Sequence, residues 1–136
     1  MSDSFDNTAL YVEINKDFTA KLIEGGEAFW SGLAEQGDSE QSGLVVMTLE
    51  YTGDLTTREM HPGGDEIITL LEGELTFIFN PGNAEEKRID LKEKDTVIIP
   101  KGVWHTVLVA RRSMVQHILM GKGSQIKSVD AQQNPK

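Results

Sequence analysis

Two short segments of the chain carry side chains that could bind a metal ion. The first segment contains Glu59, His61 and Glu66, and the second contains His105. Imidazole nitrogens and carboxylate oxygens together form a ligand set that suits Mn, Fe, Ni, Co or Zn better than soft-metal chemistry. The residue types therefore predict a site for a divalent transition metal, of open identity, if the fold brings these four side chains together.

Strand geometry would bring the four side chains together. Successive side chains of a β-strand point to opposite faces, so Glu59 and His61 would share one face. Turns that contain glycine and proline precede Glu66 and His105. If the shared faces line the inside of a barrel, the four side chains converge there. A cation would then stabilise carboxylates that are costly to bury alone.

Other interpretations of the same residues stay open. His61 and His105 are also compatible with a metal-free polar pocket, in which the charges of Glu59 and Glu66 would repel and one carboxyl would keep its proton with a raised pKa. Glu59 could be a metal ligand, a base beside the metal, or a solvent-facing side chain if the strand register slips by one residue. We expect His117 to be a surface or packing histidine.

The chain from Gly43 onward has the pattern of consecutive β-strands. Apolar and β-branched runs are separated by turn residues at intervals of about 8–12 residues, which is typical of an antiparallel sandwich or barrel. Glu72-Gly73-Glu74 predicts a tight turn that joins two strands as a hairpin. Gly25-Gly26 argues against a long helix, and the polar stretch 32–42 predicts a loop. The predicted strands span residues 11–14, 44–51, 66–71, 75–79, 88–91, 96–99, 103–110 and 114–120.

Size and charge restrict the class of partner. The 136 residues fit one domain with its own core, and 22 acidic against 13 basic residues give a net charge of −9. That charge disfavours nucleic acid and anionic membranes, because phosphate groups would be repelled. There are no cysteines and no apolar run of about 20 residues. We therefore expect a cytoplasmic protein that binds a small molecule rather than a membrane.

The two segments resemble the two sequence motifs of the cupin superfamily, the RmlC-like jelly-roll proteins. Three positions depart from the motifs: Glu59 stands where the first histidine would be, and Lys94 and Val109 replace a glycine and an asparagine of the second motif. The chain in this respect is similar to small single-domain cupins with an altered metal set. The residues that fall on the motifs in register are Gly53, His61, Glu66, Gly73, Pro100, Gly102 and His105.

The resemblance implies an all-β fold, a double-stranded β-helix or jelly-roll barrel, and a homodimer. It also implies His61, Glu66 and His105 as metal ligands, whereas Glu59 as a ligand or catalytic base rests on its position and chemistry. We predict an N-terminal strand and loop extension over residues 1–35 that packs on the barrel, a barrel over 36–125 and a polar C-terminal tail over 126–136.

The predicted function is isomerase, oxygenase or lyase chemistry by a metal-binding cupin on a small polar organic molecule. Hydroxy acids, keto acids, sugar derivatives and dicarbonyls are the expected substrate classes, because their oxygens could occupy open positions on a metal. The alternative is a non-catalytic module that binds a small ligand or a metal. The fold does not decide between them, since one fold can host many activities.

Overall fold

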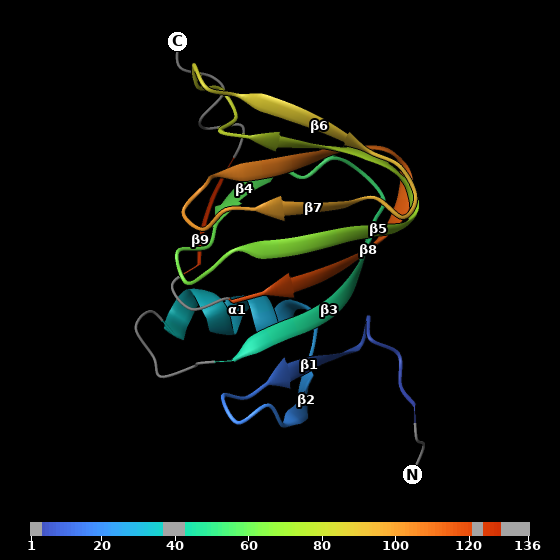
Figure 1. Ribbon diagram of the computed structural model, residues 1–136, viewed down its shortest axis with the longest axis vertical. Helices are drawn as coiled ribbons and strands as arrows, with labels where there is room; N and C mark the ends of the chain where they lie inside the picture. Colours follow the sequence, from blue (N-terminus) through green and yellow to red (C-terminus); the bar gives the residue numbers. More distant parts are fainter. Residues whose placement is uncertain (1–3, 37–42, 121–123, 129–136) are drawn as a thin grey trace.

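The computed structural model describes residues 4–36, 43–120 and 124–128, which form an all-β jelly roll with one helix (Figure 1). The strands pair antiparallel throughout these residues, so the predicted all-β fold is confirmed. In chain order the elements are β1 (Leu10–Ile14), β2 (Ala20–Glu24), α1 (Glu27–Gln36), β3 (Leu44–Tyr51), β4 (Thr57–Met60), β5 (Glu66–Phe79), β6 (Lys87–Leu91), β7 (Thr96–Ile99), β8 (His105–Leu119) and β9 (Gln125–Ser128).

Two long strands, β5 and β8, run through both layers of the barrel. The first half of β5 pairs with β7 and with the second half of β8, which in turn pairs with β3. Strands β1 and β2 extend this layer beyond β3. The second half of β5 pairs with β6 and with the first half of β8, and β4 and β9 continue the layer from there. The curled sheet thus encloses one interior (Figure 1).

The segment 72–74 is a bend within β5 and not the hairpin turn that its sequence predicts. Strand β8 stays paired with β5 on both sides of the bend, and shifts in the strand register absorb the irregularity. The chain therefore bends from one layer into the other without reversing, as a β-bulge allows. For the same reason, the strands predicted separately over 103–110 and 114–120 form the single strand β8.

A short helix, α1, replaces part of the loop predicted over residues 32–42. It begins directly after a glycine with a φ of 78°, and Phe29 in its first turn packs edge-on against Tyr11, with ring centroids 5.2 Å apart. A ring pair of this kind contributes about 0.5–1.5 kcal/mol, which offsets the helix penalty of Gly32 of about 1 kcal/mol. The rest of the predicted loop, residues 37–42, lies outside the described residues.

The buried apolar side chains form two clusters. The smaller one joins β1 and β3 to α1, which lies behind the sheet in Figure 1. Its buried members are Tyr11, Val45, Met47 and Leu119. The larger one fills the barrel between the two layers. Its buried members are Ile68, Leu70, Leu75, Phe77, Phe79, Leu91, Val97, Ile99, Val107 and Val115. Both clusters consist of side chains at alternate positions of their strands, as the sequence pattern predicts.

The C-terminal strand β9 pairs with β4 and begins one residue before the predicted polar tail. All four side chains of β9 are exposed. The strand has no buried face, so its sequence lacks the alternation of apolar and polar residues that indicates a strand. The division into extension, barrel and tail stays a prediction. Within the described ranges, the structure contains no helix that is long and apolar enough to cross a membrane.

Candidate metal centre

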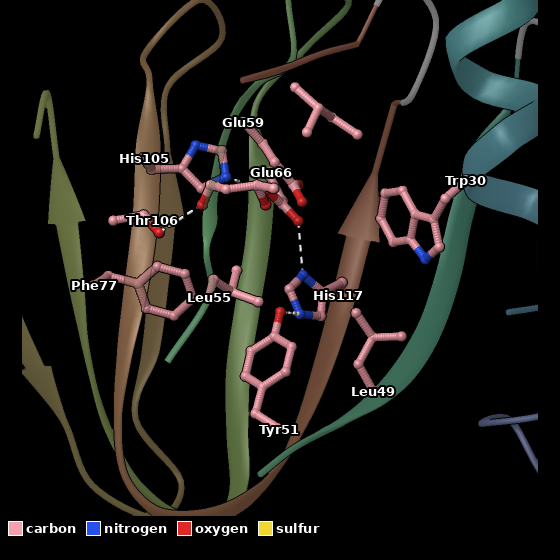
Figure 2. Close-up of a pocket in the computed structure, with 12 residues that line it drawn as sticks. Trp30, Leu49, Tyr51, Leu55, Glu59, Glu66, Phe77, His105, Thr106 and His117 are labelled. Carbon is pink, nitrogen blue, oxygen red and sulfur yellow. Dashed lines mark hydrogen bonds and ion pairs between the residues drawn. The ribbon is translucent and has the colours of Figure 1, made fainter. Parts of the chain in front are cut away.

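All three histidines of the chain lie in one buried polar cluster with two glutamates. His61 follows β4, His105 opens β8, and His117 lies farther along β8. Glu59 belongs to β4, opposite His105 in the strand register, and Glu66 opens β5. In Figure 2 the labelled histidines and glutamates of this group lie together inside the barrel.

Glu66 lies at the centre of the cluster. Its Oε1 is 3.4 Å from Nε2 of both His61 and His105, and its Oε2 is 2.7 Å from Nδ1 of His117. Glu59 Oε1 lies 3.5 Å from Nε2 of His61. One ligand atom each from Glu59, His61 and His105 lies within 4.8 Å of the other two. The structure therefore brings together all four residues that the sequence nominates as metal ligands.

The outer ring nitrogens of two histidines are held by groups outside this cluster. Nδ1 of His105 lies 3.1 Å from the carbonyl oxygen of Val103, which can only accept, so Nδ1 carries a proton. Nδ1 of His61 lies 2.7 Å from the hydroxyl of Ser124. Both rings consequently direct Nε2 at Glu66. Metal-bound histidines are commonly oriented in this way, through a hydrogen bond from the nitrogen that does not bind the metal.

Two facing atoms at the centre of the cluster lack hydrogen bonds. Within the described residues, Nε2 of His61 and Oε1 of Glu66 are buried without a hydrogen-bond partner. In the tautomer in which Nδ1 of His61 donates its proton to Ser124, Nε2 and the carboxylate oxygen both present lone pairs, so their approach is unfavourable unless a cation lies between them. A divalent metal would supply that cation and bind both atoms. The residues present therefore fit a metal ion.

The acidities within the cluster follow from these contacts. Burial by itself would raise the pKa of Glu66, but the interactions with His105, His117 and His61 outweigh burial and hold that pKa below its ordinary value. Burial would lower the pKa of His105, but the interactions with Glu66, the Val103 carbonyl and Glu59 together outweigh burial and raise it. Of the two glutamates, Glu66 is therefore not the one with the raised pKa that a metal-free pocket would require, because three imidazoles surround its carboxylate.

A cavity of about 280 Å³ opens beside the cluster, and Figure 2 shows the side chains around it. Its wall is mostly aromatic and aliphatic with a few polar groups, which is the usual form of a small-molecule site. Burial and the charges of Glu59 and Glu66 raise the pKa of Tyr51, so its hydroxyl keeps its proton at neutral pH. The cavity is lined by Trp30, Leu49, Tyr51, Leu55, Thr57, Glu59, Glu66, Phe77, His105, Thr106, His117 and Ile126.

His117 is a site residue that the sequence did not nominate, because we expected a surface or packing histidine there. It is 5% exposed, lines the cavity and bonds to Glu66, so a surface position is wrong. The signal was present in the sequence. Val115 and Leu119 share its face of β8, and both are fully buried. A histidine flanked at two-residue spacing by aliphatic side chains faces the interior of a sheet.

The comparison with protein families identifies one match. The family model for the cupin domain matches residues 45–115, which include every residue of the cluster except His117. The comparison with curated proteins gives no match.

Several solved structures are similar to parts of the chain. A cupin-2 domain containing protein from Shewanella frigidimarina has 24% identity and a TM-score of 0.47, over 55% of this chain and 68% of that one. A hydroxypropylphosphonic acid epoxidase from S. wedmorenis, solved with fosfomycin, has 19% identity and a TM-score of 0.48, over 57% and 43%. A hydroquinone 1,2-dioxygenase from Sphingomonas, solved with 4-hydroxybenzoate, has 11% identity and a TM-score of 0.47, over 62% and 63%. The matched part thus spans less than half of the epoxidase.

Proposed function

This chain belongs to the cupin family, and from this membership and the geometry of the buried cluster we propose that it binds a divalent transition metal and acts on a small organic molecule in the adjacent cavity. The observation that carries the proposal is the pair of buried atoms without hydrogen bonds, Nε2 of His61 and Oε1 of Glu66. A folded protein rarely leaves such atoms unsatisfied, because each costs about 1–3 kcal/mol. A bound metal removes that cost.

The proposed ligands are Glu59, His61, Glu66 and His105. Two carboxylates balance the charge of a divalent ion, so burial of the loaded site is electrostatically tolerable. Nitrogen and oxygen ligands in this ratio suit Mn, Fe, Ni, Co or Zn. When bound, the metal would act as a Lewis acid on an oxygen of the substrate.

Glu59 is the proposed catalytic residue. Its side chain is 22% exposed, against 4% for Glu66, and it lines the cavity. It therefore has more room than Glu66 to turn toward a bound molecule and to take up a proton from it. His105 and Glu66 also line the cavity, so a molecule held there would lie against the proposed ligands.

The cavity limits the substrate to a small organic molecule. Its volume of about 280 Å³ is at the low end for ligand sites. The apolar side chains of Leu49, Leu55 and Phe77 would contact the carbon skeleton, and the substrate oxygens would face the cluster. Isomerisation, oxygenation and lyase-type proton transfer are the proposed reaction classes, and hydroxy acids, keto acids, sugar derivatives and dicarbonyls remain the candidate substrates.

Metal content of the untagged protein, measured by elemental mass spectrometry, tests the proposal. We expect near-stoichiometric metal in the wild type and its loss in His61→Ala and His105→Ala, because each removes a ligand. Loss in Glu59→Gln as well would make Glu59 a ligand rather than only a base. Asp65→Asn is the matched control, because this neighbouring carboxylate accepts a hydrogen bond from the backbone N–H of Lys101 instead.

Two outcomes would change the proposal. Absence of metal after reconstitution with Mn, Fe, Co, Ni and Zn would contradict the metal site. A metal-loaded protein that binds a small molecule tightly but turns over none of a broad panel would favour the alternative, a non-catalytic binding module. Turnover that disappears in His105→Ala, with the fold intact, would support the enzyme.

We also propose that two copies of the chain associate as a homodimer. The outer face of the sheet carries an aliphatic row in which each residue is the register partner of the next. We call it the outer aliphatic row, and it consists of Ile98, Ile67, Ile118, Val46, Val12 and Leu22 on β7, β5, β8, β3, β1 and β2.

A cytoplasmic location, favoured by the absence of cysteine, stays a prediction.

A further inference from the structure

A hydrogen-bonded chain leads from the cluster into the cavity wall (Figure 2). Oε2 of Glu66 lies 2.7 Å from Nδ1 of His117, and Nε2 of His117 lies 2.9 Å from the hydroxyl of Tyr51. The three residues belong to β5, β8 and β3, which are consecutive neighbours in the sheet. His117 and Glu66 are 5% and 3% exposed, so water does not compete freely for these bonds.

The direction of both hydrogen bonds follows from the chemistry of the groups. The Glu66 carboxylate has only lone pairs to offer, so Nδ1 of His117 carries the proton and donates it. In the neutral ring Nε2 is then an acceptor, and the hydroxyl of Tyr51 donates to it. Oε2 of Glu66 is thus held by His117, whereas Oε1 has no hydrogen bond to the part of the chain that the structure describes and faces Nε2 of His61 and His105.

We propose that His117, itself held by Tyr51, is a positioning residue that makes Glu66 offer a single oxygen, Oε1, to the metal. The inference rests on the proposed metal site and adds how that site is kept in one geometry. A carboxylate without this restraint can rotate and bring both oxygens to the ion. Binding through one oxygen would leave room at the ion for an oxygen of the substrate.

Three substitutions separate the two hydrogen bonds that link Glu66, His117 and Tyr51. His117→Leu removes both hydrogen bonds. His117→Asn keeps a donor close to the position of Nδ1, so it retains the bond to Glu66 and loses the bond to Tyr51. Tyr51→Phe removes only the hydroxyl. Gln116→Leu is the matched control, because it makes the same kind of change one position earlier on the opposite face of β8.

The probe is cobalt(II), because its visible absorption weakens as the coordination number rises and it therefore reports how Glu66 binds. Affinity and spectrum are measured for the wild type and each variant, with thermal unfolding of the metal-free proteins as the test of folding. We expect about 10–100-fold weaker cobalt binding and a weaker visible absorption in His117→Leu, as for other residues that orient metal ligands. His117→Asn and Tyr51→Phe, which both lose only the bond between the two residues, should show similar and smaller losses, and Gln116→Leu should stay close to the wild type.

The outcomes separate this inference from the metal site itself. A wild type that binds no cobalt would overturn both. A wild type that binds cobalt, with a folded His117→Leu that binds equally tightly and gives the same spectrum, would overturn the positioning role alone. Equal losses in His117→Leu and His117→Asn would also overturn it, because the retained donor would then have no effect. If His117→Leu does not fold, the comparison of His117→Asn with Tyr51→Phe decides the question. A greater loss of cobalt affinity in His117→Asn than in Tyr51→Phe would overturn the positioning role of His117.

Discussion

At the scale of single residues, most of the site could be predicted because alternate side chains of a strand point to the same face. Glu59 and His61 share a face because they are two residues apart, and both point into the cluster as expected. This alternation could not show which groups hold the outer ring nitrogens of the histidines. The bond from His61 to Ser124 joins segments 63 residues apart, whose spacing in the sequence carries no such information.

The acidity of His105 leads to a prediction for metal binding. A histidine must release the proton from its ligating nitrogen to bind a metal, so a proton and the ion compete. Because the interactions with Glu66, the Val103 carbonyl and Glu59 together outweigh burial and raise the pKa of His105, that proton is held to a higher pH than on an ordinary histidine. We expect cobalt affinity to increase with pH and to level off only above about pH 6.5, the ordinary pKa of histidine.

Titrations of cobalt into the wild-type protein at a series of pH values between 5 and 9 would measure this dependence. Affinity that is constant across the range, with the protein folded throughout, would contradict it. The Asp65→Asn variant serves as the control, because its side chain accepts a hydrogen bond from Lys101 and leaves the competition between proton and metal unchanged.

At the scale of elements, local signals identified where the chain bends but not how. Glycine between two glutamates is a good turn signal, and the chain does change direction there. Whether it reverses depends on β8, which lies some forty residues away in the sequence. Long-range pairing of this kind is outside the reach of a local pattern. The helix α1 was missed for a similar reason, because contacts with the distant Tyr11 stabilise it.

The bend in β5 predicts a large difference between two glycines of the first motif. Gly73 has a φ of 114°, and an added Cβ would collide with Oγ of Ser113 and the backbone oxygen of Arg112. Among the residues that the structure describes, nothing lies within 4 Å of a Cβ added at Gly53. Backbone strain alone should therefore cost Gly73→Ala on the order of 1–3 kcal/mol in the free energy of unfolding.

Urea denaturation of the two alanine variants would measure the difference. Gly53→Ala should change the free energy of unfolding by less than about 0.5 kcal/mol, as is usual for exposed positions. Equal stabilities of the two variants would show that the close approach of Ser113 does not constrain β5 at Gly73.

At the scale of the whole molecule, the charge and the outer aliphatic row together restrict how two copies can meet. Each copy carries a net charge of −9, so two copies repel unless they approach through an uncharged face. The row crosses six strands spaced about 4.8 Å apart and is therefore about 24 Å long. A standard interface buries about 800 Å² on each partner, a patch roughly 28 Å across. The row is thus long enough to form the centre of a symmetric interface between copies.

The exposed members of the row give the corresponding prediction. Ile98 and Ile67 are register partners on β7 and β5 and are 57% and 38% exposed, so both side chains would enter the interface. Ile98→Lys and Ile67→Lys would each place a charge in an apolar contact, which is strongly unfavourable when the charge is unpaired. We expect light scattering after size exclusion to give a dimer mass for the wild type and a monomer mass for both variants. Thr52→Lys, which adds the same charge at an exposed position outside the row, should remain a dimer. A wild type that is monomeric at micromolar concentration, or lysine variants that stay dimeric, would contradict the assignment of this face.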